Sequence, residues 1–261
     1  TVITMYDIAI IGGGFSGTAL AIHLLRTGAP VRIALLERDS ALARGVAYST
    51  TRACHLLNVP ARQMSLYPDR PDDFVNWLCE RDIELPGRHL EEAEIPDAFV
   101  PRMYYGAYLA ERFETARAKR NTDQICEVMQ TGACDIDRDS GAVWHVTCDN
   151  GATLRARYVV MATGNFAPAN PPVPDAGDVM QSAAYIADPW DTKSQARLSA
   201  ISSDARVLLI GTGLTMADMV MSLHEQGHRG QLTAISRHGL RSRTHKAHAP
   251  LPDTAPFEPA N

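Results

Sequence analysis

The chain has 261 residues with 45% hydrophobic and 21% charged content, and its formal net charge is −5. This composition indicates a globular protein with a sizeable core, and the acidic balance argues against a nucleic-acid partner, which would need a basic surface. The sequence has no run of about 18 apolar residues and no signal peptide, so we expect a cytoplasmic protein without a membrane partner.

The cysteines argue against metal and disulfide chemistry. They are scattered, without a C-x-x-C or C-x-x-x-x-C spacing, which disfavours a zinc site and a redox-active disulfide. Scattered thiols fit a reducing cytoplasm, where most are small buried hydrophobes. The five are Cys54, Cys79, Cys126, Cys134 and Cys148.

The first predicted elements are a strand, a glycine turn and a helix. Residues 8–11 are all apolar, as in a strand buried on both faces of a parallel sheet. Gly12, Gly14 and Gly17 then form G-x-G-x-x-G, and residues 18–25 have the apolar content of a packed helix. These glycines allow a tight turn, close approach of a pyrophosphate and close packing of helix on strand. The helix would offer its positive end to the pyrophosphate.

An acidic residue follows at the spacing that a dinucleotide site requires. Residues 31–36 read as the second strand, and Glu37 closes it, 25 positions after Gly12 (37 − 12). A carboxylate there accepts the ribose hydroxyls. A purely structural glycine turn is the alternative, but strand, glycines, helix and acid together predict a dinucleotide site.

Residues 45–65 lack clear periodicity and are predicted to form an ordered loop with short turns. Loops of this length in a compact domain are usually functional or disordered, and the apolar content of this one argues against disorder. We expect it to lie over the bound cofactor; a loop that only fills space beside the sheet is the alternative.

Two helices and a surface connection come next. A helix starting at Pro71 places Phe74, Trp77 and Leu78 on one face, which is more typical of packing than of cofactor contact. Residues 84–98 are acidic with interspersed prolines and are predicted to form a surface connection. The second helix covers residues 102–119, and its apolar face holds Tyr105, Tyr108, Leu109 and Phe113.

Strands follow from residue 125. Residues 125–130, 143–148 and 154–161 are predicted strands, separated by hairpin-type turns at 139–141 and 149–151. The last of them is a buried strand that returns to the first sheet and ends in a tight turn at Thr163 and Gly164. The Pro-rich stretch 165–190 then reads as a linker between domains.

The opening pattern repeats after the linker. Residues 206–218 again read as strand, glycine turn and helix, with Gly211 and Gly213, and residues 231–235 as the next strand. Two copies of this signature predict two nucleotide sites. Met216 replaces the third glycine, so we expect the second helix to pack less closely.

The two copies differ at the end of the second strand. Ser236 stands where Glu37 stands in the first copy, and Arg237 where Arg38 stands. Losing the acid and gaining an Arg makes room for a 2′-phosphate, so the second site is predicted to prefer NADP. Arg241, Arg243 and Lys246 support this modestly; a solvated Arg237 is the alternative. His238, His245 and His248 lack carboxylate partners at ligand spacing, so no metal site is predicted.

These motifs resemble those of a known group. Gly12-x-Gly14-x-x-Gly17 with Glu37, then Ala162-Thr163-Gly164, then Gly211-x-Gly213, are similar to the two-dinucleotide-binding-domain flavoproteins. Gly45-Val-Ala-Tyr48, Leu57-Asn58-Val-Pro60 and Asp188-Pro-Trp190 resemble the FAD/NAD(P)-binding proteins related to flavin-dependent monooxygenases. The resemblance implies FAD at the first site and NADPH at the second, with His55, Asn58, Met64 and Ser65 lining the flavin. A turn-forming role is the alternative for Asn58.

Two departures from that family shape the expectation. Class B monooxygenases carry an F-x-G-x-x-x-H-x-x-x-(W/Y) fingerprint between their two sites, and residues 165–174 do not match it. Relatives also return to complete the FAD domain with a Gly-Asp motif. We therefore expect either a truncated version of a longer protein or a reduced form with incomplete sites.

The predicted fold class is α/β: a Rossmann-like FAD-binding domain at residues 1–170, with a parallel sheet plus a small antiparallel β-meander, and a partial Rossmann-like NAD(P)H-binding domain at residues 171–261. The predicted function is an FAD-dependent oxidoreductase that accepts hydride from NADPH rather than NADH, monooxygenase-like and acting on a small-molecule substrate. The alternatives are a reductase without oxygenation and a non-catalytic nucleotide-binding protein. No catalytic acid or base, and no oligomeric state, is predicted.

The candidate cofactor-binding residues are Gly12, Gly14, Phe15, Ser16, Gly17, Glu37, Arg38, Asn58, Met64, Ser65, Cys134, Thr163, Gly164, Gly211, Gly213, Thr215, Ser236 and Arg237.

Overall fold

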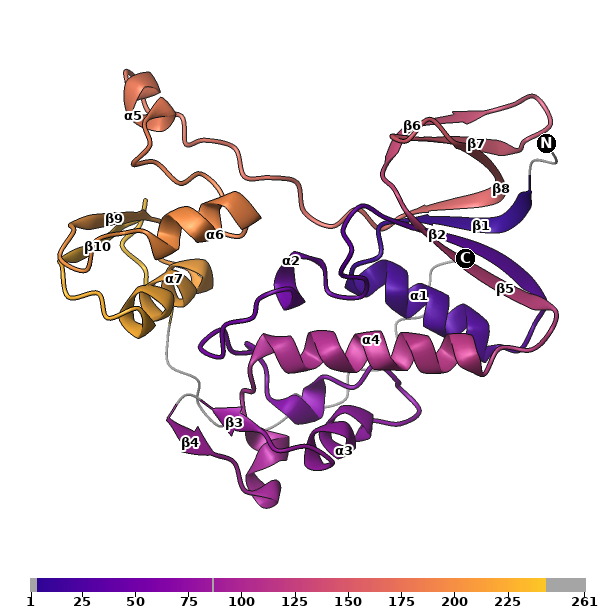
Figure 1. The fold of residues 1–261 in the computed structure, drawn as a ribbon, viewed down its shortest axis with the longest axis horizontal. Helices are drawn as coiled ribbons and strands as arrows, with labels where there is room; N and C mark the ends of the chain where they lie inside the picture. Colours follow the sequence, from indigo (N-terminus) through magenta and orange to yellow (C-terminus); the bar gives the residue numbers. More distant parts are fainter. Residues whose placement is uncertain (1–3, 86, 243–261) are drawn as a thin grey trace. The chain divides into compact units, whose positions relative to one another are not determined.

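The computed structural model describes residues 4–85 and 87–242, and its ribbon is drawn in Figure 1. Two compact units divide between Ile201 and Ser202. The predicted boundary between residues 170 and 171 concerns which cofactor each part binds, whereas these units are defined by internal contacts. That boundary therefore stays a prediction.

The first unit is built on a sheet whose centre is parallel. Its strand order is β5-β2-β1-β8-β7-β6 over the described residues. Strand β1 (Met5–Ile11) pairs in parallel with both β2 (Val31–Glu37) and β8 (Thr153–Met161), and β2 pairs in parallel with β5 (Gln124–Gln130). The expected return of the chain to the first sheet is therefore confirmed, as is the α/β fold class.

One strand of the antiparallel meander differs from the prediction, while β7 (Trp144–Cys148) and β8 correspond to the predicted strands 143–148 and 154–161. Strand β6 (Ala133–Arg138), which the sequence did not predict, pairs with β7, and β7 pairs with β8. Residues 125–130 belong instead to the parallel edge of the sheet. Asp139 closes the β6–β7 turn, because its Oδ1 accepts hydrogen bonds from the amides of Gly141 and Val143 at 2.9 and 3.0 Å.

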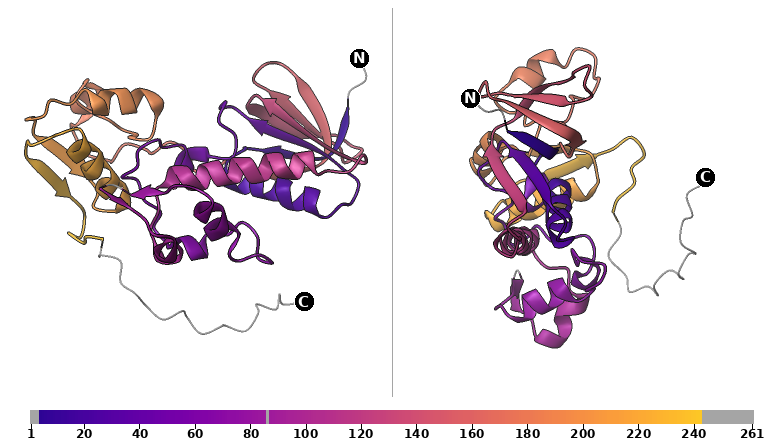
Figure 2. Two further views of the ribbon diagram at one scale, coloured as in Figure 1. Left: turned by 60° about the horizontal axis from the view of Figure 1, so that its bottom comes forward. Right: turned by 90° about the vertical axis from the view of Figure 1, so that its right-hand side faces the viewer.

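Strand β1 is buried on both faces, as its apolar run predicts. Ile10 faces a cluster formed with the helices, while Ala9 and Ile11 face a second cluster formed with the meander. Because successive side chains of a strand point to opposite faces, one short apolar strand supports both layers. Figure 2 shows the helices α1 and α4 along one side of this sheet.

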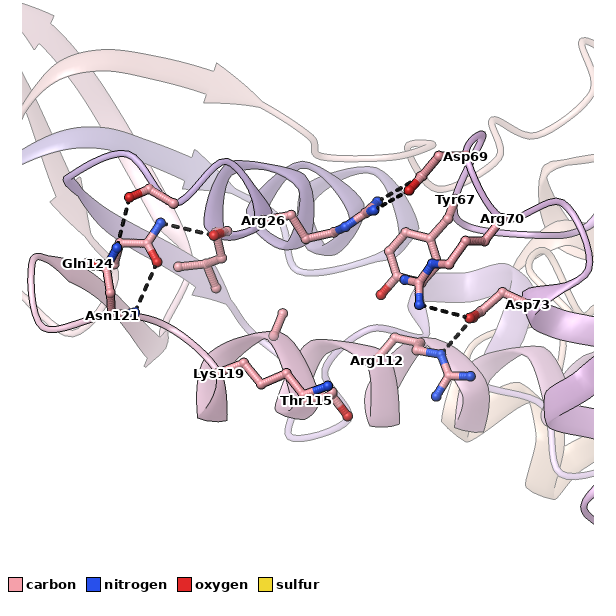
Figure 3. Close-up of a pocket in the computed structure, with 13 residues that line it drawn as sticks. Arg26, Tyr67, Asp69, Arg70, Asp73, Arg112, Thr115, Lys119, Asn121 and Gln124 are labelled. Carbon is pink, nitrogen blue, oxygen red and sulfur yellow. Dashed lines mark hydrogen bonds and ion pairs between the residues drawn. The ribbon is translucent and has the colours of Figure 1, made fainter.

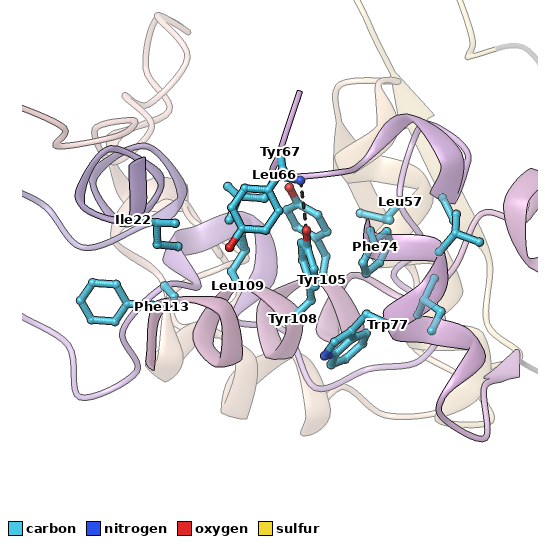
Figure 4. Close-up of a cluster of buried hydrophobic side chains, with 14 of the residues drawn as sticks. Ile22, Leu57, Leu66, Tyr67, Phe74, Trp77, Tyr105, Tyr108, Leu109 and Phe113 are labelled. Carbon is cyan, nitrogen blue, oxygen red and sulfur yellow. Dashed lines mark hydrogen bonds between the residues drawn. The ribbon is translucent and has the colours of Figure 1, made fainter. Parts of the chain in front are cut away.

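The helical layer contains the predicted aromatic stripes. Helix α1 (Phe15–Arg26) lies beside α4 (Arg102–Ala118), and α3 (Asp73–Cys79) packs against α4. All seven stripe residues that the sequence placed on the apolar faces of the two later helices are buried, and Figure 4 labels all of them except Leu78. Burial of such side chains contributes about 1.5–3 kcal/mol each. The helical layer thus holds α1 against the sheet. Its buried stripe residues are Phe74, Trp77, Leu78, Tyr105, Tyr108, Leu109 and Phe113.

The long connections contain short elements. Residues 45–65 hold α2 (Gly45–Tyr48) and the 3-10 turn η1 (Ala61–Gln63), in line with the predicted ordered loop. Residues 84–98 hold the two-stranded β3 (Glu84–Leu85) and β4 (Arg88–His89) and the turn η2 (Glu92–Asp97). This stretch is more than a surface connection, because Leu90 and Ile95 are buried in the core.

The linker carries one short helix, α5 (Gly177–Gln181), and α6 (Thr192–Ser199) follows it. The second unit then shows the predicted repeat: β9 (Val207–Ile210), α7 (Leu214–Glu225) and β10 (Leu232–Ile235), with β9 and β10 parallel.

Candidate dinucleotide sites

The first glycine turn is packed so closely that its glycines cannot be replaced freely. Gly12 has φ +107°, and its amide donates to the Leu36 carbonyl at 2.9 Å. A Cβ added at Gly12 would lie 2.3 Å from the Ala162 oxygen, and one at Gly17 would lie 1.9 Å from the Gly12 oxygen. The turn therefore requires glycine both for its dihedral angle and for its space.

The start of α1 fits a pyrophosphate. Gly14 is the N-cap in extended conformation, and the first turn of the helix contains no acidic residue. The amides at the start of a helix lack intrahelical partners and carry partial positive charge. Phe15 and Ser16 are exposed there. A Cβ added at Gly14 would lie 3.5 Å from the Gly45 Cα, an ordinary van der Waals distance, and would fill part of the space between the turn and the loop.

Glu37 lies directly against the turn. Its Oε2 accepts the Gly13 amide at 2.7 Å, and its Oε1 accepts the Asp39 amide at 3.0 Å. A carboxylate oxygen has lone pairs left after one hydrogen bond, so both could accept from a ribose as well. The carboxylate thus has a structural role in the turn that the sequence did not predict, and its contact with ribose stays a prediction.

The loop that follows β2 covers the turn. The Ala43 amide donates to the Gly13 carbonyl at 2.8 Å. Tyr48 at the end of α2 packs on α4. A Cβ added at Gly106 of α4 would lie 2.6 Å from the backbone carbonyl oxygen of Tyr48. The rings of Phe15, Tyr48 and Tyr105 form one cluster, with the last two centroids 4.7 Å apart. Gly106, a glycine inside a helical pattern, was the only sequence signal of this close approach.

The other residues predicted to line the flavin occupy different environments within that loop. Asn58 is exposed, and Met64 is half-buried against the core. The Ser65 hydroxyl donates to the Arg70 carbonyl at 2.6 Å and accepts the Tyr67 amide at 3.1 Å, so it stabilises the loop itself. Their contact with a flavin stays a prediction.

His55 is fully buried beside the linker. Its Nδ1 lies 2.6 Å from the Thr50 Oγ1, and its ring meets the Trp190 ring edge-on at 5.3 Å. The guanidinium of Arg102 lies 5.7 Å from the same indole centroid. These contacts join the Asp188-Pro-Trp190 segment to the 50–56 loop, so the structure gives His55 a packing role.

Arg38 and Cys134 follow β2 and β5, whose carboxyl ends lie side by side. Glu37 pairs with Gln130 at these ends. A Cβ added at Gly132 would lie 3.2 Å from the Arg38 Cγ. Hydrogen bonds from the Thr131 hydroxyl and the Gly132 amide lower the pKa of Asp149 beside it. Cys134, two residues after Gly132, is exposed.

The tight turn after β8 packs against the first glycine turn. The Ala162 amide donates to the Ile11 carbonyl at 2.8 Å, and the Thr163 amide nitrogen would lie 3.3 Å from a Cβ added at Gly12. Thr163 is exposed, and Gly164 has φ +66°.

The second glycine turn repeats the backbone of the first without its packing. Gly211 has φ +112°, and its amide donates to the Ile235 carbonyl at 2.8 Å. A Cβ added at Gly211 or Gly213 would meet no described atom within 4 Å. The Thr212 hydroxyl donates to the Leu240 carbonyl, which folds the segment after β10 across the turn.

The predicted phosphate-binding residues of the second turn are accessible. Ser236 and Arg237 directly follow β10 and are exposed, as is Thr215 in the first turn of α7. Arg243, His245, Lys246 and His248 lie outside the described residues. Within the described ranges no group of three or more metal-ligating side chains occurs. No helix in that part of the chain is long and apolar enough to cross a membrane.

Comparisons with known proteins agree with this geometry. The sequence profile of the FAD-NAD(P)-binding family matches residues 9–166, more than half of the chain. Among curated proteins the comparison finds no match.

Solved structures show the same fold. A steroid monooxygenase bound to NADP aligns with TM-score 0.55 at 24% identity, over 88% of this chain and 38% of its own. A flavin monooxygenase from Stenotrophomonas maltophilia aligns with TM-score 0.58 at 20% identity, over 90% and 58%. Cyclohexanone monooxygenase from Rhodococcus sp. Phi1 bound to NADP+ aligns with TM-score 0.54 at 20% identity, over 89% and 38%. The chain thus spans 38% to 58% of the length of these structures.

Proposed function

Because this chain belongs to the FAD-NAD(P)-binding family, we propose that it is an FAD-dependent oxidoreductase that takes its reducing equivalents from NADPH. The observation that carries the proposal is the duplicated turn. Gly12 and Gly211 have nearly the same positive φ, and the backbone amide of each donates a hydrogen bond to a carbonyl of the neighbouring strand. Glu37 ends the second strand of the first copy, whereas Ser236 stands at that position in the second copy, and an Arg follows in each.

The first turn would hold FAD. The free amides at the start of α1 face the pyrophosphate, and Glu37 stands where a ribose hydroxyl would be bound. Arg38 and Cys134 lie at the same end of the sheet and would flank the adenosine. This half of the site is rigid, because Glu37, Ala43 and Ala162 all bind or pack on the turn.

The second turn would hold NADPH. Arg237 is exposed at the end of β10 and would pair with the 2′-phosphate, while Ser236 leaves the space that an acid would occupy. When both cofactors are bound, they supply the hydride chemistry. The chain contributes binding, orientation and exclusion of water, and no side chain of it is assigned as an acid or base.

The substrate class proposed is a small molecule, and the proposed reaction is monooxygenase-like, as in the solved structures with the same fold. A reductase that does not use oxygen is the second candidate, because residues 165–174 lack the class B fingerprint. A protein that binds nucleotides without turnover is the third, because Met216 and the open second turn make that site looser.

The test is an absorbance spectrum of the purified protein with FAD, followed by anaerobic addition of NADPH and, separately, NADH. We expect a flavin spectrum that bleaches faster with NADPH. Peroxide formed on readmission of air, or its absence, separates the oxygen-using reaction from the reductase. A bound flavin that neither nucleotide bleaches would favour the binding protein, and a chain that binds no FAD would refute the proposal.

A further inference from the structure

A hollow of about 650 Å³ lies at the end of α1 opposite the glycine turn (Figure 3). Its walls are the last turn of α1, the segment 67–73 and the last two turns of α4. Twelve helical residues rise about 18 Å in total, and no residue of the glycine turn lines the hollow. It is therefore a separate place from the dinucleotide site, and nothing in the proposed function uses it.

The hollow is cationic although the chain as a whole has a net charge of −5. Four cationic and two acidic side chains line it, which leaves an excess of two positive charges. These six side chains are Arg26, Arg70, Arg112, Lys119, Asp69 and Asp73.

The two acids are already neutralised by ion pairs. Arg26 donates to both oxygens of Asp69, at 3.1 and 2.6 Å. Arg112 donates its Nε–H to Asp73 at 2.7 Å, and the Tyr108 hydroxyl donates to the same oxygen at 2.8 Å. The first pair joins α1 to the segment before α3, and the second joins α3 to α4. The excess charge remains on the other two cations.

Those two cations are Arg70 and Lys119. The nearest Arg70 nitrogen lies 3.4 Å from an Asp73 oxygen, too far for a strong hydrogen bond, and its guanidinium lies 3.9 Å from the Tyr67 ring centroid. Stacking thus orients the guanidinium and leaves its N–H groups available. Lys119 forms no ion pair with any residue in the described ranges.

We propose that this hollow binds a phosphate monoester. A dianion matches the excess of two charges, and a planar guanidinium with a nearby ammonium is a set that recognises phosphate oxygens. The volume lies within the range of small-molecule sites, so it leaves room for the organic part of the ester. The alternative is a purely structural ion-pair network that holds α1 and α4 together. Such a network would need neither the excess positive charge nor an Arg70 guanidinium whose N–H groups are left available.

Calorimetric titration with inorganic phosphate at constant ionic strength tests this proposal. Saturating FAD and NAD+, neither of which carries a phosphate monoester, are added to occupy the two glycine turns, and a titration of Arg237→Gln shows whether Arg237 takes up the probe. We expect Lys119→Gln to weaken phosphate binding about tenfold, since it removes one charge-assisted contact. Lys119→Arg should restore it, and Lys193→Gln, which removes an exposed lysine outside the hollow, should bind phosphate like the wild type.

Equal affinities of Lys119→Gln and the wild type, or no binding to either, would overturn the proposal. Because Lys119 has no side-chain partner in the described ranges, the variant should fold, and a thermal melt that matches the wild type verifies this. The result does not depend on flavin reduction, so failure here and failure of the proposed oxidoreductase are distinguished.

Discussion

The two glycine turns have nearly the same backbone but very different surroundings. Gly12 and Gly211 differ by 5° in φ (112 − 107), and Gly14 and Gly213 are both extended N-caps of twelve-residue helices. Around the first turn, added Cβ atoms at Gly12 and Gly17 would overlap backbone oxygens; around Gly211 and Gly213 they would meet nothing described within 4 Å. The dihedral angles of the turn therefore require glycine only at its first position, Gly12 or Gly211. The third glycine and Ala162 determine how tightly the turn is packed.

The largest expected effect comes from placing alanine at the two equivalent positions. Both Gly12→Ala and Gly211→Ala incur the cost of a positive φ, about 1–2 kcal/mol. Only Gly12→Ala adds an overlap with Ala162, for a total destabilisation of about 2–5 kcal/mol. All three tryptophans lie in the first unit, so urea unfolding followed by tryptophan fluorescence reports Gly12→Ala, and far-UV circular dichroism reports Gly211→Ala. Equal losses in the two variants would contradict the difference in packing.

The second-largest expected effect is a loss of FAD affinity when Glu37, the acid beside the first turn, is replaced. Glu37→Ala loses the acceptor of the Gly13 amide as well as the predicted ribose contact. Hydrogen bonds to charged groups contribute about 1.5–3 kcal/mol, so the Kd for FAD should rise about tenfold to a hundredfold. Quenching of FAD fluorescence measures it, and Asp39→Asn, which removes the neighbouring exposed carboxylate, is the control. An unchanged Kd in Glu37→Ala would show that this carboxylate does not hold the cofactor.

A smaller effect should distinguish the two reduced nicotinamide nucleotides at the second turn. Arg237→Gln should weaken NADPH binding about fivefold to tenfold, since one exposed charge-assisted contact is lost, and leave NADH binding unchanged. Arg206→Gln provides the matched control, because Arg206 precedes β9 at the opposite end of the strand. Equal weakening of both nucleotides would refute the 2′-phosphate assignment.

The smallest effect concerns thiol reactivity. Cys134 is exposed, whereas Cys126 is buried, and burial raises the pKa of the Cys126 thiol to about 11. The thiolate is the reactive form, so at pH 8 a thiol reagent should modify Cys134 rapidly and Cys126 slowly. If Cys134 flanks the adenosine, FAD should slow its modification several-fold. Cys134→Ser identifies the rapid phase, and a rate independent of FAD would remove Cys134 from the site.

The parts predicted from sequence depend on local patterns. The runs around Gly12 and Gly211 and the stripes at Phe74 and Tyr105 each lie within one helix or turn. Their periodicity therefore reflects burial directly. The division of cofactors between the two turns came from comparing Glu37 with Ser236, together with the resemblance to flavoproteins.

The missed features depend on contacts between distant residues. Strand β6 carries Asp135 and Asp137, which have low strand propensity, and it is a strand because it pairs with β7 at the edge of the sheet. The approach of Tyr48 to Gly106 joins residues 58 positions apart (106 − 48). Likewise, the sequence spacing between Gly12 and Glu37 predicted a ribose contact but could not reveal that Glu37 accepts a hydrogen bond from the Gly13 amide.

The most direct test of two separate nucleotide turns is a pair of matched substitutions, Gly14→Val and Gly213→Val, titrated with FAD and with NADP+. Each places a branched side chain where the backbone must approach a pyrophosphate. We predict that Gly14→Val loses FAD binding and keeps NADP+ binding, and that Gly213→Val does the reverse. Wild-type FAD affinity in Gly14→Val, or equal loss of FAD in both variants, would contradict the assignment of one cofactor to each turn.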